Sequence, residues 1–191
     1  MNDKLRAGFA LTGSFCTFEK AFSALETLLD KGVDVTPIMS FNAARIDTRF
    51  GKAHEHIERL ETLTGKKVIK TIEDAEPIGP KKMFDILIIA PCTANTAAKL
   101  ALGITDTPVT MAVKSHVRNA RPVVIAVSTN DALAAAAKNI GYLQSMRNYY
   151  FVPYTQDAPD KKPFSAVADL TRVYDTVQAA LEGRQIQPVL I

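Results

Sequence analysis

Four apolar segments of this chain are each followed by small side chains that carry a hydroxyl or an amide group. These polar positions are Gly13-Ser14, Ser40, Thr93 with Asn95 and Thr96, and Ser128 with Asn130. Small residues at a helix start let backbone N–H groups approach a bound anion or a planar ring closely. Neighbouring parallel strands end at one crevice, so the pattern predicts a ligand site there. Helix capping is the competing explanation for Ser14 and Thr93, since each precedes a predicted helix.

The segment around residue 90 is predicted to be the centre of the fold. Residues 86–90 are an unbroken apolar run between Asp85 and Pro91, which is typical of a strand covered on both faces. After the polar turn, the Ala-rich residues 97–101 predict a helix that ends at Gly103. This order of strand, turn and helix places a helix start directly beside the end of a central strand.

Strands and helices alternate along the rest of the chain. Apolar runs predict strands over residues 7–11, 33–39, 122–127 and 150–153, and a short strand or extended piece over 68–72. Apolar residues at three- and four-residue spacing predict helices from Phe15 to Gly32 and over 53–64, 108–119, 133–140 and 166–181. The alternation indicates an α/β fold with a doubly wound parallel sheet, and 191 residues fit a single domain over 1–191.

Composition argues against several classes of function. The 23 Lys and Arg residues nearly balance the 20 Asp and Glu residues and are scattered, so we expect no nucleic-acid partner. No apolar run approaches the length of a bilayer span and the start lacks a signal-peptide core, so we expect a cytoplasmic protein without membrane contact. Cys16 and Cys92 are far apart in the sequence and are expected to be reduced thiols.

Familiar catalytic and nucleotide-binding motifs are missing. The chain has no G-x-G-x-x-G, no Walker A lysine loop and no G-x-S-x-G elbow. His54 and His56 are two residues apart, so on a helix they point to different faces and we expect them to be solvated rather than to hold a metal. Gly13 is expected to allow a positive φ, and Ser14 to cap the first helix or to bind a phosphate.

The central turn carries a resemblance to a known family. The stretch Pro91-Cys92-Thr93-Ala94-Asn95-Thr96 resembles the Pro-Ala-Ser/Thr-Ala-Asn-Thr motif of the flavoprotein superfamily that includes flavin-containing cysteine decarboxylases and flavin prenyltransferases. The resemblance covers nearly the whole chain and implies a Rossmann-like flavoprotein fold that binds FMN. The residues it implies for cofactor binding are Gly13, Ser14, Ser40, Pro91, Cys92, Thr93, Asn95, Thr96 and Ser128.

Two departures from the decarboxylases are equally informative. Those enzymes carry a catalytic histidine shortly before the central strand, and residues 77–85 contain none. They also carry a Pro-x-Met-Asn-x-x-Met-Trp substrate clamp after the next strand, of which only Asn130 survives in residues 127–134. The resemblance therefore implies that the flavin scaffold is kept while the decarboxylation site is lost.

Within this superfamily, the late segment YYFVPYTQDAPDKKPFSAVADL is similar to the family of dipicolinate synthase B subunits. That similarity implies a cytoplasmic oxidoreductase subunit that oxidises dihydrodipicolinate during sporulation. It also implies a dicarboxylate substrate, a companion A subunit and a homo-oligomer built on trimers, and the redox partner is either the flavin or NADP held by the companion. From the residues alone, the apolar tip of the tail over 184–191 is expected to dock on a neighbour. Candidate carboxylate ligands are Asn95 and Asn130, and also Lys114 and His116. The alternative is a non-catalytic flavin-fold scaffold or regulatory subunit for the A subunit.

Overall fold

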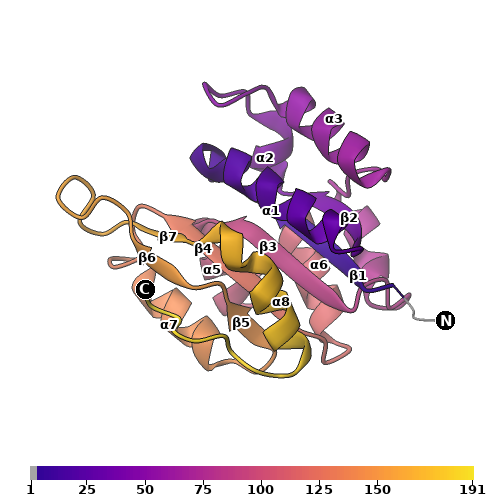
Figure 1. Cartoon of the computed structure of the whole chain (residues 1–191). Helices are drawn as coiled ribbons and strands as arrows, with labels where there is room; N and C mark the ends of the chain where they lie inside the picture. Colours follow the sequence, from indigo (N-terminus) through magenta and orange to yellow (C-terminus); the bar gives the residue numbers. More distant parts are fainter. Residues whose placement is uncertain (1–3) are drawn as a thin grey trace.

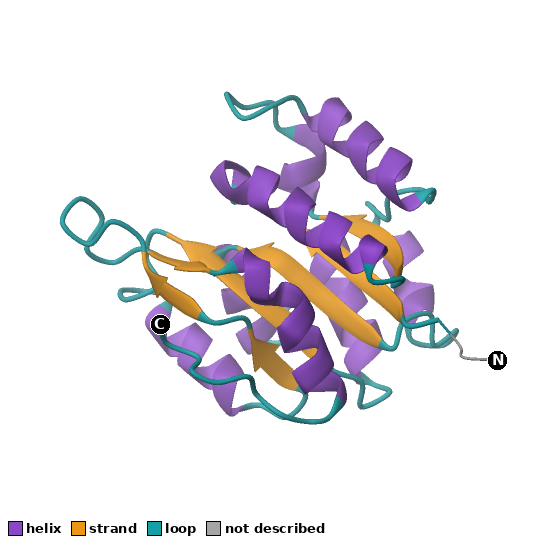
Figure 2. Cartoon of the chain, viewed as in Figure 1, coloured by secondary structure: helices purple, strands orange, loops and turns teal. Residues whose placement is uncertain are grey.

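The computed structural model describes residues 4–191 and contains a seven-stranded sheet with helices on both faces (Figures 1 and 2). Five of these strands run parallel in the order β2-β1-β3-β4-β5. They are β1 (Arg6–Leu11), β2 (Asp34–Met39), β3 (Ile86–Cys92), β4 (Val123–Thr129) and β5 (Tyr149–Phe151). The order reverses between β1 and β3, and at such a point the loops after the two strands part to leave a crevice. The predicted doubly wound α/β sheet is confirmed.

Helices cover both faces of the sheet. In Figure 1, α1 (Phe18–Asp30) and α8 (Val173–Leu181) lie in front, and α5 (Ala94–Ala101), α6 (Pro108–Val117) and α7 (Ala137–Ser145) lie behind. The helix α3 (Ala53–Thr64) packs beyond the β2 edge. The short helices are η1 (Phe15–Thr17), α2 (Phe41–Arg45), α4 (Ile72–Ala75), η2 (Glu76–Ile78) and η3 (Leu170–Arg172).

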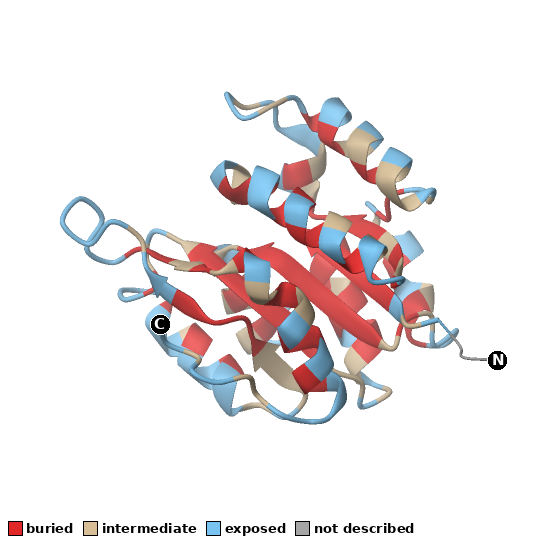
Figure 3. Cartoon of the chain, viewed as in Figure 1, coloured by how far each residue is buried: buried red, intermediate tan, exposed pale blue. Residues whose placement is uncertain are grey.

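The apolar runs read from the sequence become the core of the sheet. All seven residues of β3 are buried, and so are the first six of β4 (Figure 3). Ile89 of β3 lies beside Ala10 of β1 and Ile125 of β4, so β3 is a central strand with a paired strand on each side. The helix predicted from Phe15 to Gly32 is also confirmed, as η1 followed by α1, and its Phe18 and Phe22 side chains are buried in this core.

Two helices lie close to their predicted ranges. The helix α3 has the predicted bounds, and Gly65 ends it in the left-handed conformation at φ 67°. Thr107 caps α6 by accepting a hydrogen bond from the Thr110 N–H, and Pro108 occupies the first helical position. The strand β3 is longer than predicted, since it continues through Pro91 to Cys92 beyond an irregularity in its pairing with β4.

The segments after residue 130 differ most from the sequence prediction. Residues 131–136 form turns and α7 begins only at Ala137, because the Asp131 carbonyl accepts hydrogen bonds from the N–H groups of both Ala134 and Ala136. The predicted helix over 166–181 is wrong in its first third. Its start is the strand β7 (Ala166–Ala168), which pairs antiparallel with the end of β4 and with β6 (Tyr154–Gln156).

Both edges of the sheet are bordered by irregular segments of the same chain. Ile69 forms an isolated bridge with Ile38 of β2, so residues 68–72 are the extended piece that was one of the two predicted alternatives, and α4 begins at Ile72. At the other edge Leu190 bridges Tyr154 of β6, and the Ile191 N–H donates to the Tyr154 carbonyl at 3.1 Å. The tail that was expected to dock on a neighbour therefore pairs with its own chain, although Leu190 keeps 65% of its surface exposed.

No helix within residues 4–191 has the length and apolar character that a membrane span requires.

Candidate functional site

A cavity of about 690 Å³ opens at the carboxyl edge of the sheet, where β1, β3 and β4 end. Its volume is in the range typical of small-molecule and cofactor sites. The residues that line it are Gly13, Ser14, Phe15, Cys16, Thr17, Thr48, Arg49, Phe50, Thr93, Ala94, Asn95, Ser128, Thr129, Asn130, Asp157, Lys162, Ser165, Ala166 and Val167. Three of the four polar strand ends singled out in the sequence thus meet in one place.

Thr12 fixes the first two of these strand ends against each other. Its buried hydroxyl donates to the Pro91 carbonyl at 2.7 Å and accepts from the Thr93 N–H at 3.0 Å. The Thr12 N–H also donates to the same Pro91 carbonyl at 3.3 Å. The turn after β1 and the turn after β3 therefore form one hydrogen-bonded unit, a role for Thr12 that the sequence reasoning missed.

The turn after β1 presents backbone donors to the cavity. The Ser14 hydroxyl is 2.8 Å from the Ser128 hydroxyl, so it links β1 to β4. It does not cap the first helix, which was one of the two roles predicted for it. Gly13 does not have a positive φ, which corrects that expectation as well. Within residues 4–191, no acceptor takes a hydrogen bond from the N–H groups of Phe15 or Cys16. These donors at the helix start can bind an anion.

The turn after β3 has the same character. Thr93 caps α5 by accepting a hydrogen bond from the Thr96 N–H, so the capping explanation is correct for this residue. The N–H groups of Ala94 and Asn95 find no acceptor among the described residues. The Asn95 side chain is exposed at the cavity, whereas Thr96 is buried below it.

Four of the predicted cofactor-binding residues do not line the cavity: Ser40, Pro91, Cys92 and Thr96. Pro91 and Cys92 are buried within β3, and burial raises the pKa of the Cys92 thiol to about 12, so this thiol stays protonated. Ser40 is buried at the end of β2, where its hydroxyl accepts from the Ala43 N–H at 3.3 Å and caps α2. A direct contact of these residues with a cofactor stays a prediction.

The end of β4 supplies the third wall. Ser128 and Asn130 both line the cavity, and the Asn130 side chain is exposed. Ser165, just before β7, donates its hydroxyl to the Thr129 carbonyl at 3.3 Å and lies 3.5 Å from the Asn130 amide oxygen. The antiparallel hairpin therefore holds the Asn130 loop in place.

Two loops that the sequence reasoning did not assign to the site complete the cavity. The loop between α2 and α3 contributes Arg49 and Phe50, and the loop between β6 and β7 contributes Asp157 and Lys162. Both loops project from the sheet on the side where the parallel strands end (Figure 1). The only sequence signal for the second loop is its charged, Pro-containing composition, DAPDKKP.

Lys114 and His116, two candidate carboxylate ligands, lie away from this cavity on α6. Lys114 is exposed there, and His116 is buried with its Nε2 atom 3.0 Å from the Pro122 carbonyl. Burial lowers the pKa of His116 to about 4, against the opposing effect of the Pro122 hydrogen bond. His116 is thus a neutral core residue, and its assignment as a substrate ligand is not supported by its position.

The prediction that both histidines of α3 are solvated is wrong for His56. His54 is exposed, but His56 keeps only 5% of its surface exposed and lies edge-on to Phe18, with ring centroids 4.9 Å apart. Its Nε2 atom has no hydrogen-bond partner within the described chain. Burial lowers the pKa of His56. Across residues 4–191, no cluster of three metal-ligating side chains is present.

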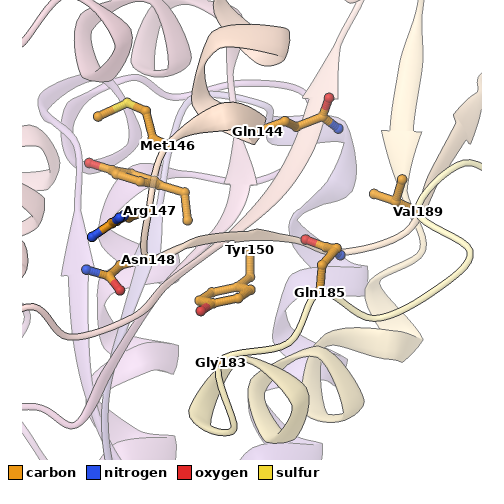
Figure 4. A pocket seen from close by; sticks show the side chains of 9 residues that line it. Gln144, Met146, Arg147, Asn148, Tyr150, Gly183, Gln185 and Val189 are labelled. Atoms are coloured by element: carbon orange, nitrogen blue, oxygen red, sulfur yellow. The ribbon is translucent and has the colours of Figure 1, made fainter.

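A second cavity, of about 540 Å³, lies between the start of β5 and the segment after α8 (Figure 4). Its polar side chains include Gln185, whose amide pairs with both the N–H and the carbonyl of Phe151 at 2.7 Å. Gln144 in the same wall donates to the Tyr154 hydroxyl at 3.1 Å. Because these amides already hold the backbone and the core together, this cavity is a weaker candidate than the one at the strand ends.

Known proteins resemble this chain in sequence and in fold. The sequence model of the flavoprotein family matches residues 1–182. The B subunit of dipicolinate synthase from Bacillus subtilis (strain 168) is 46% identical over 186 residues, which cover 97% of this chain and 93% of that protein. The crystal structure of the corresponding B subunit from Bacillus halodurans C superposes with a TM-score of 0.90 at 42% identity, covering 100% of this chain and 98% of that one.

A more distant structure shares the fold. The Burkholderia xenovorans protein DmrB, solved in complex with FMN, is 18% identical with a TM-score of 0.71, covering 95% of this chain and 98% of that chain.

Proposed function

Since this chain belongs to the flavoprotein family, we propose that it is an FMN-binding subunit of an enzyme that oxidises dihydrodipicolinate to dipicolinate, pyridine-2,6-dicarboxylate, during sporulation. The observation that carries the proposal is the 46% identity, over 97% of this chain, with the dipicolinate synthase B subunit of Bacillus subtilis. The cavity at the strand ends is the place where this function would reside, because it combines open backbone donors with polar side chains.

The residues at this cavity fit an FMN. The free N–H groups of Phe15 and Cys16 would hold the phosphate, beside the hydroxyl pair of Ser14 and Ser128. A Cβ atom built on Gly13 would come no closer than 3.7 Å to any side chain, so the fold itself does not require glycine there. A closely approaching ligand explains the glycine. The Thr93 to Asn95 turn would face the flavin ring.

The proposed reaction removes two electrons and two protons from the dihydropyridine ring. When bound, FMN supplies an acceptor for a hydride. The chain's own contribution would be to hold the two carboxylates of the substrate, for which Asn95 and Asn130 offer exposed amide donors at the cavity. No side chain with an evident acid/base role lines the cavity within residues 4–191, since Asp157 is ion-paired with Lys162 at 2.7 Å.

Decarboxylation of cysteine is not the proposed activity. No histidine is among the described residues that line the cavity, and positioned proton transfer is typically worth about 10²- to 10⁴-fold in rate. We therefore expect no enethiol product from cysteine or cysteinyl peptides. A rate comparable with that of true decarboxylases would show that the fold has retained the activity by other residues.

The proposal includes a partner and an assembly. A companion A subunit would complete the catalytic unit and hold NADP, and the chain itself would form a homo-oligomer built on trimers in the cytoplasm. The two free thiols, Cys16 and Cys92, are compatible with a reducing compartment. The subunit designation of the Bacillus subtilis relative supports the companion.

The test is reconstitution with and without the companion. Purified chain is loaded with FMN, and dipicolinate formation is followed with the chain alone, the A subunit alone and both together. We expect a flavin absorbance that persists through gel filtration, and turnover only in the mixture. Full turnover by either subunit alone would contradict the proposed division of labour, and failure to retain FMN would contradict the proposed cofactor.

A second candidate function is a scaffold that shapes the companion's active site without redox chemistry. The absence of an acid/base residue among the described residues of the cavity favours it. This candidate predicts that an A subunit mixed with FMN-free chain is as active as one mixed with FMN-loaded chain, whereas the first proposal predicts a large difference.

A further inference from the structure

We propose that Arg49 is the residue with which the cavity recognises a carboxylate of a planar, ring-shaped dicarboxylate. This inference rests on the proposed function and assigns one task within it: Arg49 binds the substrate and not the cofactor. It is carried by the charges that line the cavity, by the turn that presents Arg49, and by the way its guanidinium group is held.

Among the described residues that line the cavity, one cationic side chain has no oppositely charged partner. Its charged lining residues are Arg49, Asp157 and Lys162. The Lys162 ammonium group is 2.7 Å from the Asp157 carboxylate, so these two charges compensate each other. Arg49 makes no hydrogen bond or ion pair with any residue between 4 and 191. The cavity therefore carries an uncompensated positive charge, which favours an anionic ligand.

A tight turn presents this charge. The Thr48 N–H donates to the Gly51 carbonyl at 3.0 Å, and the Gly51 N–H donates back to Thr48 at 3.2 Å. The Phe50 N–H donates to the Thr48 hydroxyl at 3.1 Å. Arg49 and Phe50 are thus the two central residues of a closed turn whose backbone is held by three hydrogen bonds.

The turn also has a fixed seat. Gly51 has a φ of 128°, and a Cβ atom there would be 2.7 Å from the His56 ring, so the backbone lies directly on that ring. His56 is itself held by Phe18 and Phe22, with ring centroids 4.9 and 6.0 Å away. The turn that carries the exposed Arg49 is therefore packed, through Gly51, on a cluster of three aromatic rings.

The guanidinium group is held in a way that leaves its donors free. Its carbon lies 4.8 Å from the centroid of the Phe50 ring. Stacking uses the face of a guanidinium group and leaves the N–H fork at its edge, which matches a carboxylate with two parallel hydrogen bonds. Phe50 keeps 43% of its surface exposed and offers an apolar face beside that fork. An arginine next to an aromatic ring suits a planar ring that bears carboxylates.

Arg45 provides a matched control. Its guanidinium carbon lies 4.9 Å from the centroid of the Phe41 ring, it is exposed, and it also makes no ion pair with any described residue. Unlike Arg49, it does not line the cavity. The same substitution at the two positions therefore separates the position at the cavity from the loss of a surface charge and a stacked ring.

The experiment measures the affinity of FMN-loaded protein for dipicolinate and for pyridine-2-carboxylate, by calorimetry, with the A subunit present. We expect R49Q to raise the dissociation constant of dipicolinate about ten- to hundred-fold, because a charge-assisted bidentate contact is lost. R45Q should leave the affinity within about twofold. FMN affinity, measured by quenching of flavin fluorescence, should be the same in wild type, R49Q and R45Q.

Each outcome decides something different. Equal dipicolinate affinity in R49Q and wild type would overturn the role of Arg49 while leaving the proposed function intact. A parallel loss of FMN in R49Q would overturn it as well, because Arg49 would then bind the cofactor phosphate. Wild type that holds FMN but binds no dicarboxylate would instead refute the proposed function. The variant R49K, which keeps the charge and lacks the fork, should bind dipicolinate with intermediate affinity.

Discussion

The amino-terminal ends of the parallel strands, called the closed edge below, differ from their carboxyl-terminal ends, called the open edge, in how polar groups are used. At the edge where β3 begins, Asp85 lies 2.9 Å from the Arg6 guanidinium group and 3.2 Å from that of Arg121. Also at this edge, His116 Nε2 lies within hydrogen-bonding distance of the Pro122 carbonyl. At the edge where β3 ends, backbone donors such as the Cys16 N–H have no partner within the described chain. The candidate site thus lies where backbone N–H groups have no hydrogen-bond acceptor in the described chain.

This contrast predicts a division of effects. Substitutions at the closed edge should lower the free energy of unfolding and spare ligand binding. Substitutions at the open edge should weaken ligand binding and leave the free energy of unfolding unchanged. The four changes below test that division, from the largest expected effect to the smallest.

Ser14→Asp is the strongest test at the open edge. The new carboxylate would lie where the FMN phosphate is proposed, and like charges about 4 Å apart in a partly desolvated site repel by roughly 4 kcal/mol. We expect the dissociation constant of FMN, measured by fluorescence quenching, to rise about a thousand-fold. His54→Ala, an exposed change on α3, should leave FMN binding unchanged. Equal binding by the two variants would mean that the phosphate lies elsewhere.

Gly79→Ala is the corresponding test near the closed edge. A Cβ atom at Gly79 would lie 2.0 Å from the Ser115 carbonyl oxygen, and a backbone atom of a buried helix cannot give way easily. We expect the free energy of unfolding in urea to fall by about 3 kcal/mol, with unchanged FMN affinity for the folded fraction. Gly141→Ala in α7, where the added methyl group meets nothing, is the control and should be neutral or stabilising by about 0.5–1 kcal/mol.

Acid should destabilise the protein through the same closed edge. Burial lowers the pKa of His116 from 6.5 to about 4, so the unfolded chain binds more protons between these values. The contribution of His116 is therefore complete above about pH 6.5 and is lost as the pH falls toward 4, by about 2–3 kcal/mol. Urea unfolding at pH 7 and pH 4 measures this loss. In His116→Gln the difference between the two pH values should shrink by that amount, and an unchanged difference would contradict the assignment.

Gly13→Ala is the smallest and most selective change. Its Cβ atom would be 3.7 Å from Phe15 and 3.8 Å from Asn42, which are ordinary contacts. Stability should therefore stay within about 0.5 kcal/mol of wild type, while FMN binds about tenfold more weakly because the methyl group occupies the approach to the turn. A loss of stability without a loss of FMN affinity would show that Gly13 is needed for packing and not for ligand binding.

The sequence was sufficient for the parts of the fold in which local pattern and tertiary packing agree. The bounds of α3 follow from its apolar spacing and from Gly65, and β3 follows from an apolar run that only a doubly covered strand needs. The predicted helix over 166–181 failed because Val167 and Leu170 have helical spacing, yet β4 extends far enough to pair with residues 166 and 167. Such pairing depends on a distant strand and leaves no local signal.

The candidate site divides in the same way. Ser14, Thr93 and Ser128 were predictable because each follows an apolar run, and parallel strands bring such positions together. Arg49 lies in a loop that follows the short helix α2 and not a strand, so no apolar run before it pointed to the cavity, and the turn that carries it packs on His56 through Gly51. His56 was expected in solvent because its spacing from His54 says nothing of Phe18, Phe22 and Gly51, which cover its ring from distant parts of the chain.

The outer strands β2 and β6 limit how copies of this chain can associate through their sheets. Lys66 lies along the β2 edge, with its ammonium group 2.7 Å from Asp34 and 3.1 Å from the Thr36 hydroxyl, and Ile69 pairs with the end of that strand. At the β6 edge the last residues of the chain pair with Tyr154. A charged side chain or a covering segment on an edge strand prevents sheets from joining edge to edge. Copies of this chain are therefore not expected to join through the β2 or β6 edge, and a truncation of residues 187–191 would leave the Tyr154 edge open to pairing with another chain.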